Sequence, residues 1–150
     1  MPVMVGVISD THGFLRPEVL NILKACDFIL HGGDAGRPEV LNALRAIAPL
    51  YVVRGNNDTG WAERLPTSLA FSIGNLNFFM VHDQKEVPQD LDGTDVVVFG
   101  HSHRYFERQV GERLWLNPGS CGRRRFNLEI TMAVMSIDDG NFQVEKINIC

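Results

Sequence analysis

The sequence predicts an α/β fold in which two mixed β-sheets pack together with helices on the outside. Three observations predict it. Residues 3–53 alternate between short apolar runs and amphipathic segments. Residues 69–149 contain three pairs of apolar runs, and each pair is joined by a short turn. The length of 150 residues suits one domain with a sizeable core, so we expect a single domain over residues 1–150.

The first half of the chain reads as strand, helix, strand, helix, strand. Residues 3–9, 28–30 and 50–53 are short, continuously apolar and rich in β-branched side chains, which is typical of buried strands. Residues 17–26 and 38–47 are predicted helices, because each begins with proline followed by glutamate and then presents an apolar face. Strands that alternate with helices pair in parallel through right-handed crossovers.

The second half changes to hairpins. Residues 95–99 read as one more buried strand, and residues 61–65 could form a single helical turn. The predicted hairpins comprise residues 69–73 with 76–81, 105–110 with 113–116, and 131–137 with 142–149. We therefore expect mostly antiparallel strands in this half.

Charge and cysteine content limit the function classes. A formal charge of −4 disfavours stable nucleic-acid binding, which requires a basic face. Cys26, Cys121 and Cys150 are odd in number and show no paired spacing, which indicates reduced thiols and a cytoplasmic location. No apolar run reaches the ~18 residues of a membrane helix. No basic stretch precedes the first apolar run, so we expect neither a signal peptide nor membrane association.

Short polar motifs follow most of the predicted strands, and four of the five histidines lie in them. Because strands that end together deliver their next residues to one edge of a sheet, we expect these side chains to gather there. Carboxylate, imidazole and amide groups without cysteine indicate a hard metal site. Each motif alone is compatible with an ordinary turn, and only the set predicts metal. The motifs are Asp10-Thr11-His12, Gly32-Gly33-Asp34, Gly55-Asn56-Asn57-Asp58, His82 and Gly100-His101-Ser102-His103.

This ordered set resembles that of the calcineurin-like metallophosphoesterases. The short chain and the later Asn117-Pro118-Gly119-Ser120 make it similar to the small YfcE-type phosphodiesterase branch. The resemblance runs from residue 3 to about residue 120. It implies a four-layer α/β/β/α sandwich of two mixed β-sheets flanked by helices.

The resemblance also implies two divalent metal ions bridged by Asp34. The first ion would be held by Asp10, His12, Asp34 and His103, and the second by Asp34, Asn56, His82 and His101. Two such ions ~3.5–4 Å apart lower the pKa of a shared water and clamp the phosphoryl oxygens. A metal-bridging hydroxide would then attack a phosphate ester in line. Mn²⁺ is our first choice of metal, with Ni²⁺, Fe²⁺, Co²⁺ and Zn²⁺ as alternatives.

The expected activity is that of a phosphodiesterase acting on a small phosphodiester, with Asn57, Asp58 and His82 beside the reacting group. Many members of the family have histidine at the position of Asn57, where it assists the leaving group. Asparagine donates hydrogen bonds but is no general acid near neutral pH, so good leaving groups are favoured. Asp58 is expected to order the loop through backbone hydrogen bonds.

Several alternatives stay open at this point. The same fold could serve a phosphomonoesterase or a nuclease, or a non-catalytic protein-binding scaffold like a retromer subunit. Every implied ligand position holds a competent side chain, which argues against the scaffold. His31 is interpreted as a core or supporting histidine. Asp83 could orient His82 or repel an anionic substrate, and residues 123–125 could meet substrate phosphate or only solvent. Exposed edge strands could support a homo-oligomer.

Overall fold

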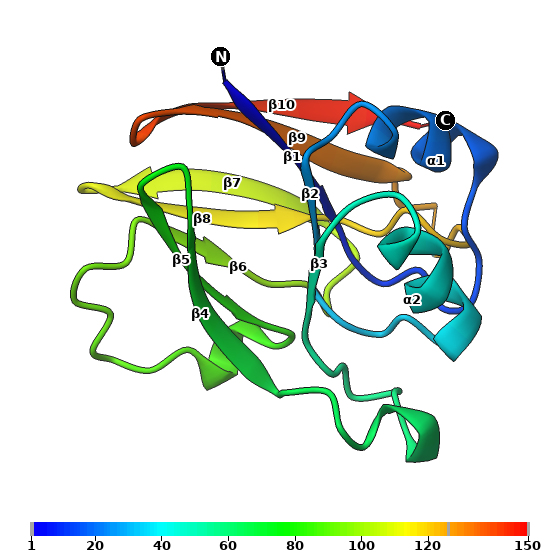
Figure 1. Cartoon of the computed structure of the whole chain (residues 1–150). Helices are drawn as coiled ribbons and strands as arrows, with labels where there is room; N and C mark the ends of the chain where they lie inside the picture. Colours follow the sequence, from blue (N-terminus) through cyan, green and yellow to red (C-terminus); the bar gives the residue numbers. More distant parts are fainter. Residues whose placement is uncertain (1, 126, 150) are drawn as a thin grey trace.

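The computed structural model describes residues 2–125 and 127–149, and it shows two mixed five-stranded β-sheets packed face to face (Figure 1). The first sheet has the strand order β10-β9-β1-β2-β3 and the second the order β4-β5-β6-β8-β7. The first sheet consists of β1 (Val3–Ile8), β2 (Phe28–His31), β3 (Leu50–Val52), β9 (Thr131–Asp138) and β10 (Asn141–Asn148). The second consists of β4 (Ser68–Ile73), β5 (Leu76–Val81), β6 (Val96–Val98), β7 (Tyr105–Val110) and β8 (Arg113–Pro118).

The predicted alternation in the first half is confirmed. Strand β1 pairs in parallel with β2, and β2 with β3, through the helices α1 (Pro17–Leu23) and α2 (Pro38–Arg45). Both helices end before the predicted limits at residues 26 and 47. In each case the chain tightens into a last turn with bonds between residues three apart, such as Cys26 N–H to Leu23 O at 2.9 Å.

The predicted hairpins of the second half are also present. Strands β4 and β5, β7 and β8, and β9 and β10 pair antiparallel. Strand β6 is the exception, because it pairs in parallel with both β5 and β8. The predicted helical turn after residue 60 is the 3-10 helix η1 (Gly60–Ala62).

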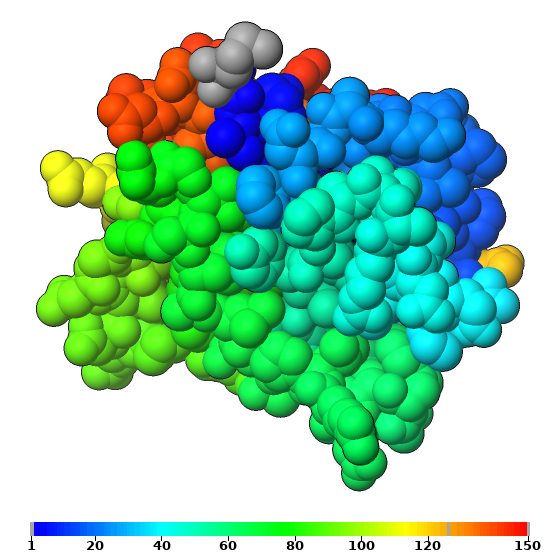
Figure 2. All heavy atoms as spheres, in the orientation of Figure 1, coloured from blue at the N-terminus to red at the C-terminus, as the bar shows by residue number. Residues whose placement is uncertain are grey.

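Two apolar cores hold the layers together. Side chains between the sheets, such as Leu30, Met80 and Leu116, are fully buried. The outer face of the first sheet is buried under α1 and α2, where Ile29 packs with Leu23. In the space-filling view the helical side, in blue and cyan, and the segment that contains β4 and β5, in green, form one continuous body (Figure 2).

The outer layer over the second sheet is thinner than the helical layer over the first. The described part of the chain has no α-helix there. A loop containing the 3-10 helix η2 (Gln84–Glu86) covers this face, and its Val87 and Leu91 pack against Val97 and Phe99. The architecture is the predicted sandwich, with a fourth layer made mainly of loop.

The structure describes two of the three cysteines. Cys26 and Cys121 are free thiols, and burial raises the pKa of Cys121 to about 12, so this thiol is inert. Cys150 lies outside the described residues. Over residues 2–125 and 127–149, no helix is both long and apolar enough to cross a membrane.

Backbone hydrogen bonds join the loops at one edge of the two sheets. Asp10 N–H donates to Gly33 O at 2.9 Å, which ties the loop after β1 to the loop after β2. Gly100 N–H donates to His82 O at 2.9 Å, which ties the loops after β6 and β5. The polar motifs therefore meet at this edge, as the parallel pairing of their strands requires.

Candidate metal centre

Five predicted ligands occupy the left-handed region of backbone conformation. Outside glycine, this region costs about 1–2 kcal/mol per residue, so the surrounding structure must hold these residues in place. Strained residues of this kind concentrate at functional sites. Their φ angles are 55° for Asp10, 47° for His12, 58° for Asp34, 74° for His101 and 63° for His103.

A first group of ligand atoms comprises Asp10, His12 and His103. The Nε2 atoms of His12 and His103 are 3.3 Å apart, and Asp10 Oδ1 lies 3.4 Å from His103 Nε2 and 3.7 Å from His12 Nε2. Two ligand atoms that are each about 2.0–2.2 Å from a Zn²⁺ ion lie about 2.8–3.6 Å apart when the angle between them is between a right angle and the tetrahedral angle. The two shorter separations fall in this range, so the spacing suits a divalent cation.

A second group comprises Asp10, Asp34 and His82. His82 Nε2 lies 3.3 Å from Asp34 Oδ2 and 3.8 Å from Asp10 Oδ1. Asp34 Oδ2 is also 3.7 Å from His12 Nε2 in the first group. Asp34 Oδ2 therefore faces one histidine of each group, as Asp10 Oδ1 does, and the bridging role of Asp34 stays a prediction.

Two atoms of this cluster are buried without a hydrogen-bond partner among the described residues: Asp10 Oδ1 and His82 Nε2. Such atoms are rare in folded proteins, because an unpaired buried polar group costs free energy. A cation between the carboxylate and the imidazole would give both atoms a partner. The donor set is therefore chemically suited to a hard or borderline divalent ion.

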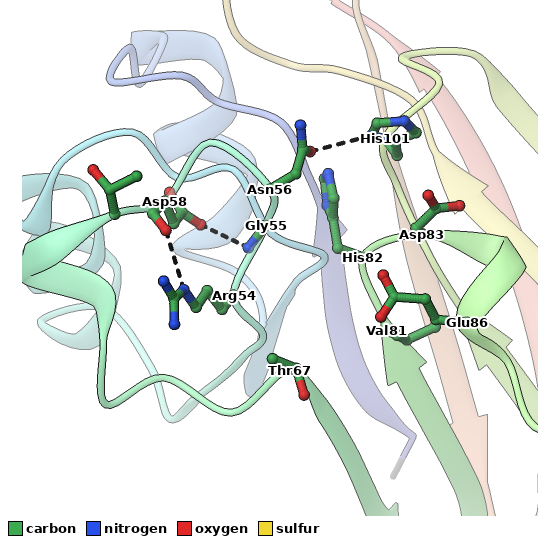
Figure 3. Close-up of a pocket in the computed structure, with 11 residues that line it drawn as sticks. Arg54, Gly55, Asn56, Asp58, Thr67, Val81, His82, Asp83, Glu86 and His101 are labelled. Atoms are coloured by element: carbon green, nitrogen blue, oxygen red, sulfur yellow. Dashed lines mark hydrogen bonds between the residues drawn. The ribbon is translucent and has the colours of Figure 1, made fainter.

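The structure leaves Asn56 and His101 outside this close cluster. Both are exposed, and His101 Nδ1 lies 3.2 Å from Asn56 Oδ1 at the rim of a cavity (Figure 3). His101 remains near the cluster through its ring, whose centroid is 5.3 Å from that of His82. The assignment of each of the seven side chains to a particular ion stays a prediction.

A backbone carbonyl orients His82. Its Nδ1 lies 2.7 Å from Gly32 O, so Nδ1 carries a proton and Nε2 is directed at the carboxylates. Asp83 does not orient His82. Its Oδ1 instead accepts a hydrogen bond from Lys85 N–H at 3.0 Å and caps η2. Sequence reasoning missed Gly32, since a carbonyl that acts through the main chain leaves no side-chain signal.

Burial and the neighbouring charges shift the pKa values of the cluster in opposite directions. Burial alone would lower the pKa of His82, but the carboxylates of Asp34 and Asp10 raise it to about 9. Burial would raise the pKa of Asp10, but the imidazoles of His103 and His12 hold it well below its usual range. The carboxylates are therefore anionic near neutral pH, which is the form that binds metal.

Neighbouring side chains fix the two carboxylates. Asn57 donates to both oxygens of Asp34, from its backbone N–H at 2.8 Å and from Nδ2 at 3.1 Å. Ser9 Oγ donates to Asp10 Oδ2 at 2.7 Å, and His101 N–H donates to the same oxygen at 3.1 Å. Sequence reasoning missed Ser9, whose only signal was its position directly before Asp10.

The loop of Asn117 and Ser120 reaches the candidate metal centre. Asn117 Nδ2 donates to Gly100 O at 3.0 Å, and Ser120 Oγ donates to Asp10 O at 2.9 Å. The arginines that follow are exposed. Arg123 lies with its guanidinium carbon 5.4 Å from the centroid of the Phe14 ring.

Asp58 is buried and binds three backbone amides. Its Oδ2 accepts from Asp34 N–H and Gly55 N–H, both at 2.9 Å, and its Oδ1 accepts from Gly36 N–H at 3.1 Å. It therefore ties the loop after β3 to the loop that carries Asp34. Its predicted place among the catalytic residues stays a prediction, and the geometry gives it a positioning role.

Asp58→Asn is expected to lower the free energy of unfolding by about 1–3 kcal/mol, because an amide nitrogen cannot accept the hydrogen bonds that a carboxylate oxygen accepts. Urea unfolding of the metal-free protein measures the change. Asp138→Asn, at an exposed position on the far end of β9, is the matched control. Equal stability of the two variants would contradict this role of Asp58.

His31 is a core histidine, which is how its sequence position was interpreted. It is fully buried, and its Nδ1 accepts from Gly33 N–H at 3.1 Å. Its Nε2 therefore carries the proton and donates to Thr11 Oγ1 at 3.0 Å, and Thr11 in turn donates to Ala35 O at 3.0 Å. Burial lowers the pKa of His31 to about 4, although Asp10 and Asp58 act to raise it.

Stability is expected to fall in acid because of His31. In the unfolded chain the His31 imidazole takes up a proton as the pH falls below its ordinary pKa of 6.5. In the folded protein its pKa is about 4, so the imidazole stays neutral to a lower pH. The contribution of neutral His31 to the free energy of unfolding is therefore complete above pH 6.5 and is lost as the pH falls toward 4. Between pH 7 and pH 5 the free energy of unfolding is expected to fall by about 2 kcal/mol. Urea unfolding at pH 7 and pH 5 compares wild type with His31→Leu, which lacks the titrating imidazole. Equal pH dependence in the two proteins would refute this account.

A cavity of about 250 Å³ opens beside the cluster (Figure 3). Its walls include Asn56, His82 and His101 on the side of the metal centre. The other charged groups on its walls are Arg54, Asp58, Asp83 and Glu86. It offers a small, polar space in which part of a substrate could lie next to the ligands.

Comparison with known proteins agrees with this geometry. Residues 3–140 match the family described as the calcineurin-like phosphoesterase superfamily domain. The chain belongs to this superfamily. A probable metallophosphoesterase of Methanothermobacter thermautotrophicus is 30% identical over 96% of this chain and 91% of its own length. A phosphodiesterase of Methanocaldococcus jannaschii is 27% identical over 78% of this chain and 83% of its own length.

Solved structures of other proteins share the fold. A single mutant of Vps29 from Entamoeba histolytica gives a TM-score of 0.79 at 23% identity and covers 99% of this chain and 100% of its own. The phosphoesterase YfcE from E. coli gives 0.72 at 21% identity, with 99% and 100% covered. The phosphoesterase fold of this chain, predicted from its motifs, is therefore confirmed.

Proposed function

We propose that this protein is a dinuclear, metal-dependent phosphodiesterase. The observation that carries the proposal is the buried convergence of Asp10, Asp34 and His82, in which Asp10 Oδ1 and His82 Nε2 lack hydrogen-bond partners among the described residues. Membership of the phosphoesterase superfamily supports the hydrolysis of phosphate esters, and the name of the Methanocaldococcus relative supports diesters.

The ligands would divide between two ions as the motifs imply. Asp10, His12 and His103 would hold one ion, Asn56, His82 and His101 the other, and Asp34 both. When bound, the two cations supply an activated water and positive charge beside the phosphoryl oxygens. Asn57 holds the bridging carboxylate through two hydrogen bonds, and Gly32 O fixes the imidazole of His82. These contacts keep the donors in place before substrate arrives.

No side chain at the position of Asn57 can protonate the leaving group as a general acid. Asn57 occupies the position beside Asp34, where its amide donates hydrogen bonds but cannot give up a proton near neutral pH. General acid catalysis typically contributes 10²–10⁴-fold, so its absence favours esters of acidic alcohols. We therefore propose a small phosphodiester with a good leaving group as substrate.

The remaining parts of the proposal concern metal, partners and location. Mn²⁺ is the proposed metal, because mixed imidazole, carboxylate and amide ligands suit it. The net negative charge argues against stable nucleic-acid binding. The unpaired cysteines support a cytoplasmic location for the protein.

Hydrolysis of bis(p-nitrophenyl) phosphate tests the proposal. Purified protein is expected to release p-nitrophenolate with Mn²⁺, to lose this activity after treatment with a chelator, and to regain it when Mn²⁺ is returned. Rates on p-nitrophenyl phosphate and on a short oligonucleotide separate the diesterase from a monoesterase or a nuclease. Full activity in the chelator would overturn the proposal.

A protein-binding scaffold is the second candidate, favoured by the likeness to Vps29. The complete set of ligand side chains supports the enzyme instead. Protein that binds Mn²⁺ but hydrolyses no phosphate ester would favour the scaffold.

A further inference from the structure

Two hollows adjoin the metal centre at different ligands. The cavity described above meets it at Asn56, His82 and His101. A second hollow of about 180 Å³ meets it at His103, and its walls include Arg104, Tyr105, Glu129 and Lys146. Because His103 belongs to one group of ligand atoms and His82 to the other, the two hollows open from the two halves of the site.

The charges of the two hollows differ. The cavity at His82 carries the carboxylates of Asp83 and Glu86 in its wall, and the Nε of its arginine, Arg54, already donates to Asp58 O at 3.1 Å. We call this the acidic hollow. An additional negative charge on a substrate would be repelled there.

The hollow at His103, which we call the basic hollow, carries two cations and one carboxylate. Lys146 Nζ lies 2.9 Å from Glu129 Oε2 and 5.1 Å from the centroid of the Tyr105 ring, so its charge is engaged. Arg104 is exposed, and its guanidinium has no ion pair or hydrogen bond to any described residue. This hollow therefore presents one unengaged guanidinium beside the metal centre.

The geometry of the reaction gives the basic hollow a role. In an in-line displacement at phosphorus, the attacking and leaving oxygens lie on opposite sides, so the ester oxygen that is retained points sideways. The alcohol attached to that oxygen must then extend along the protein surface next to the metal centre. A guanidinium binds phosphate with two parallel hydrogen bonds, which gives both affinity and orientation.

We propose that the basic hollow binds a second phosphate group on the retained alcohol of the diester, and that Arg104 determines this specificity. The inference rests on the proposed diesterase function. The substrate class becomes a small phosphodiester with a further phosphate on one arm. The acidic hollow disfavours the reverse orientation, so each substrate binds in one direction.

Two substrates with the same leaving group test the proposal: thymidine 5′-(p-nitrophenyl phosphate) and its 3′-phosphorylated form. Wild type is expected to show a higher kcat/KM for the phosphorylated form. Arg104→Ala is expected to reduce the ratio of the two kcat/KM values by about tenfold, and Arg104→Lys by less, because lysine keeps only the charge. Arg108→Ala removes a guanidinium from β7, the strand that directly follows Arg104, outside the hollow and is expected to keep the wild-type ratio.

Binding without turnover gives the second readout. Thymidine 3′,5′-bisphosphate is expected to bind wild type about tenfold more tightly than thymidine 5′-phosphate by calorimetry, and Arg104→Ala is expected to abolish the difference. An unchanged preference in Arg104→Ala, or an equal loss in Arg108→Ala, would overturn the inference even if diesters are hydrolysed. If no diester is hydrolysed but the binding preference depends on Arg104, the diesterase function fails and the phosphate site stands.

Discussion

Asp34→Ala is expected to reduce kcat/KM for bis(p-nitrophenyl) phosphate by at least about 10³-fold, because losing a carboxylate proposed to bind both metal ions would weaken the binding of both and with it the activation of the attacking water. Its Oδ2 is the atom nearest to His82 Nε2, at 3.3 Å, and it also faces His12 Nε2 at 3.7 Å. Asp10 Oδ1 also faces both histidines, at 3.7 and 3.8 Å, but Asp34 is the described carboxylate that Asn57 holds. His101→Ala is expected to abolish activity as well, because His101 is a proposed ligand of the second ion.

Steady-state kinetics with Mn²⁺ measure the loss, and circular dichroism checks that the variant is folded. Asp138→Ala is the matched control, since it removes an exposed carboxylate at the end of β9 that lies away from the site. Activity of folded Asp34→Ala within tenfold of wild type would exclude Asp34 as a bridging ligand.

Gly55→Ala is expected to have the second largest effect, on both stability and metal binding. A Cβ at this position would overlap Oδ1 and the backbone nitrogen of Asp34. Neither neighbour can move freely, because Asp58 binds the N–H groups of Gly55 and Asp34 and the N–H group of Asn57 binds Asp34 Oδ1. The overlap is expected to cost about 1–3 kcal/mol and to displace the bridging carboxylate.

Urea unfolding and Mn²⁺ titration measure the two effects of Gly55→Ala. Gly111→Ala serves as the control, because Gly111 has a φ of 61° but no atom within 4 Å of the added Cβ. It is expected to cost about 1 kcal/mol through backbone strain alone and to leave metal binding intact. Wild-type Mn²⁺ affinity in Gly55→Ala would contradict the close packing of this loop against Asp34.

Much of the fold follows from local patterns in the sequence. Proline followed by glutamate marked the start of α1 and α2 at Pro17 and Pro38, and both begin there. Their ends were less predictable, because residues after Leu23 and Arg45 keep an apolar pattern while the chain turns toward the next strand. The parallel pairing of β6 was not predictable either, since it depends on contacts with β5 and β8 that no local pattern records.

The candidate site was predictable in composition but not in detail. Asp10, Asp34 and His82 converge because their strands end at one edge of the packed sheets. The contacts that hold them were hidden, since they come from Ser9 Oγ and from the carbonyl of Gly32. The left-handed conformations of the ligands were equally hidden, because long-range hydrogen bonds impose them against local preference.

The metal content of the purified protein is the decisive measurement for a dinuclear centre. Protein dialysed against buffer containing Mn²⁺ and then freed of unbound ions is analysed by inductively coupled plasma mass spectrometry, with Asp34→Ala alongside. We expect about two ions per chain in wild type and a clear loss in Asp34→Ala. Wild-type protein with no bound metal, or with the same content as Asp34→Ala, would contradict the proposed dinuclear centre.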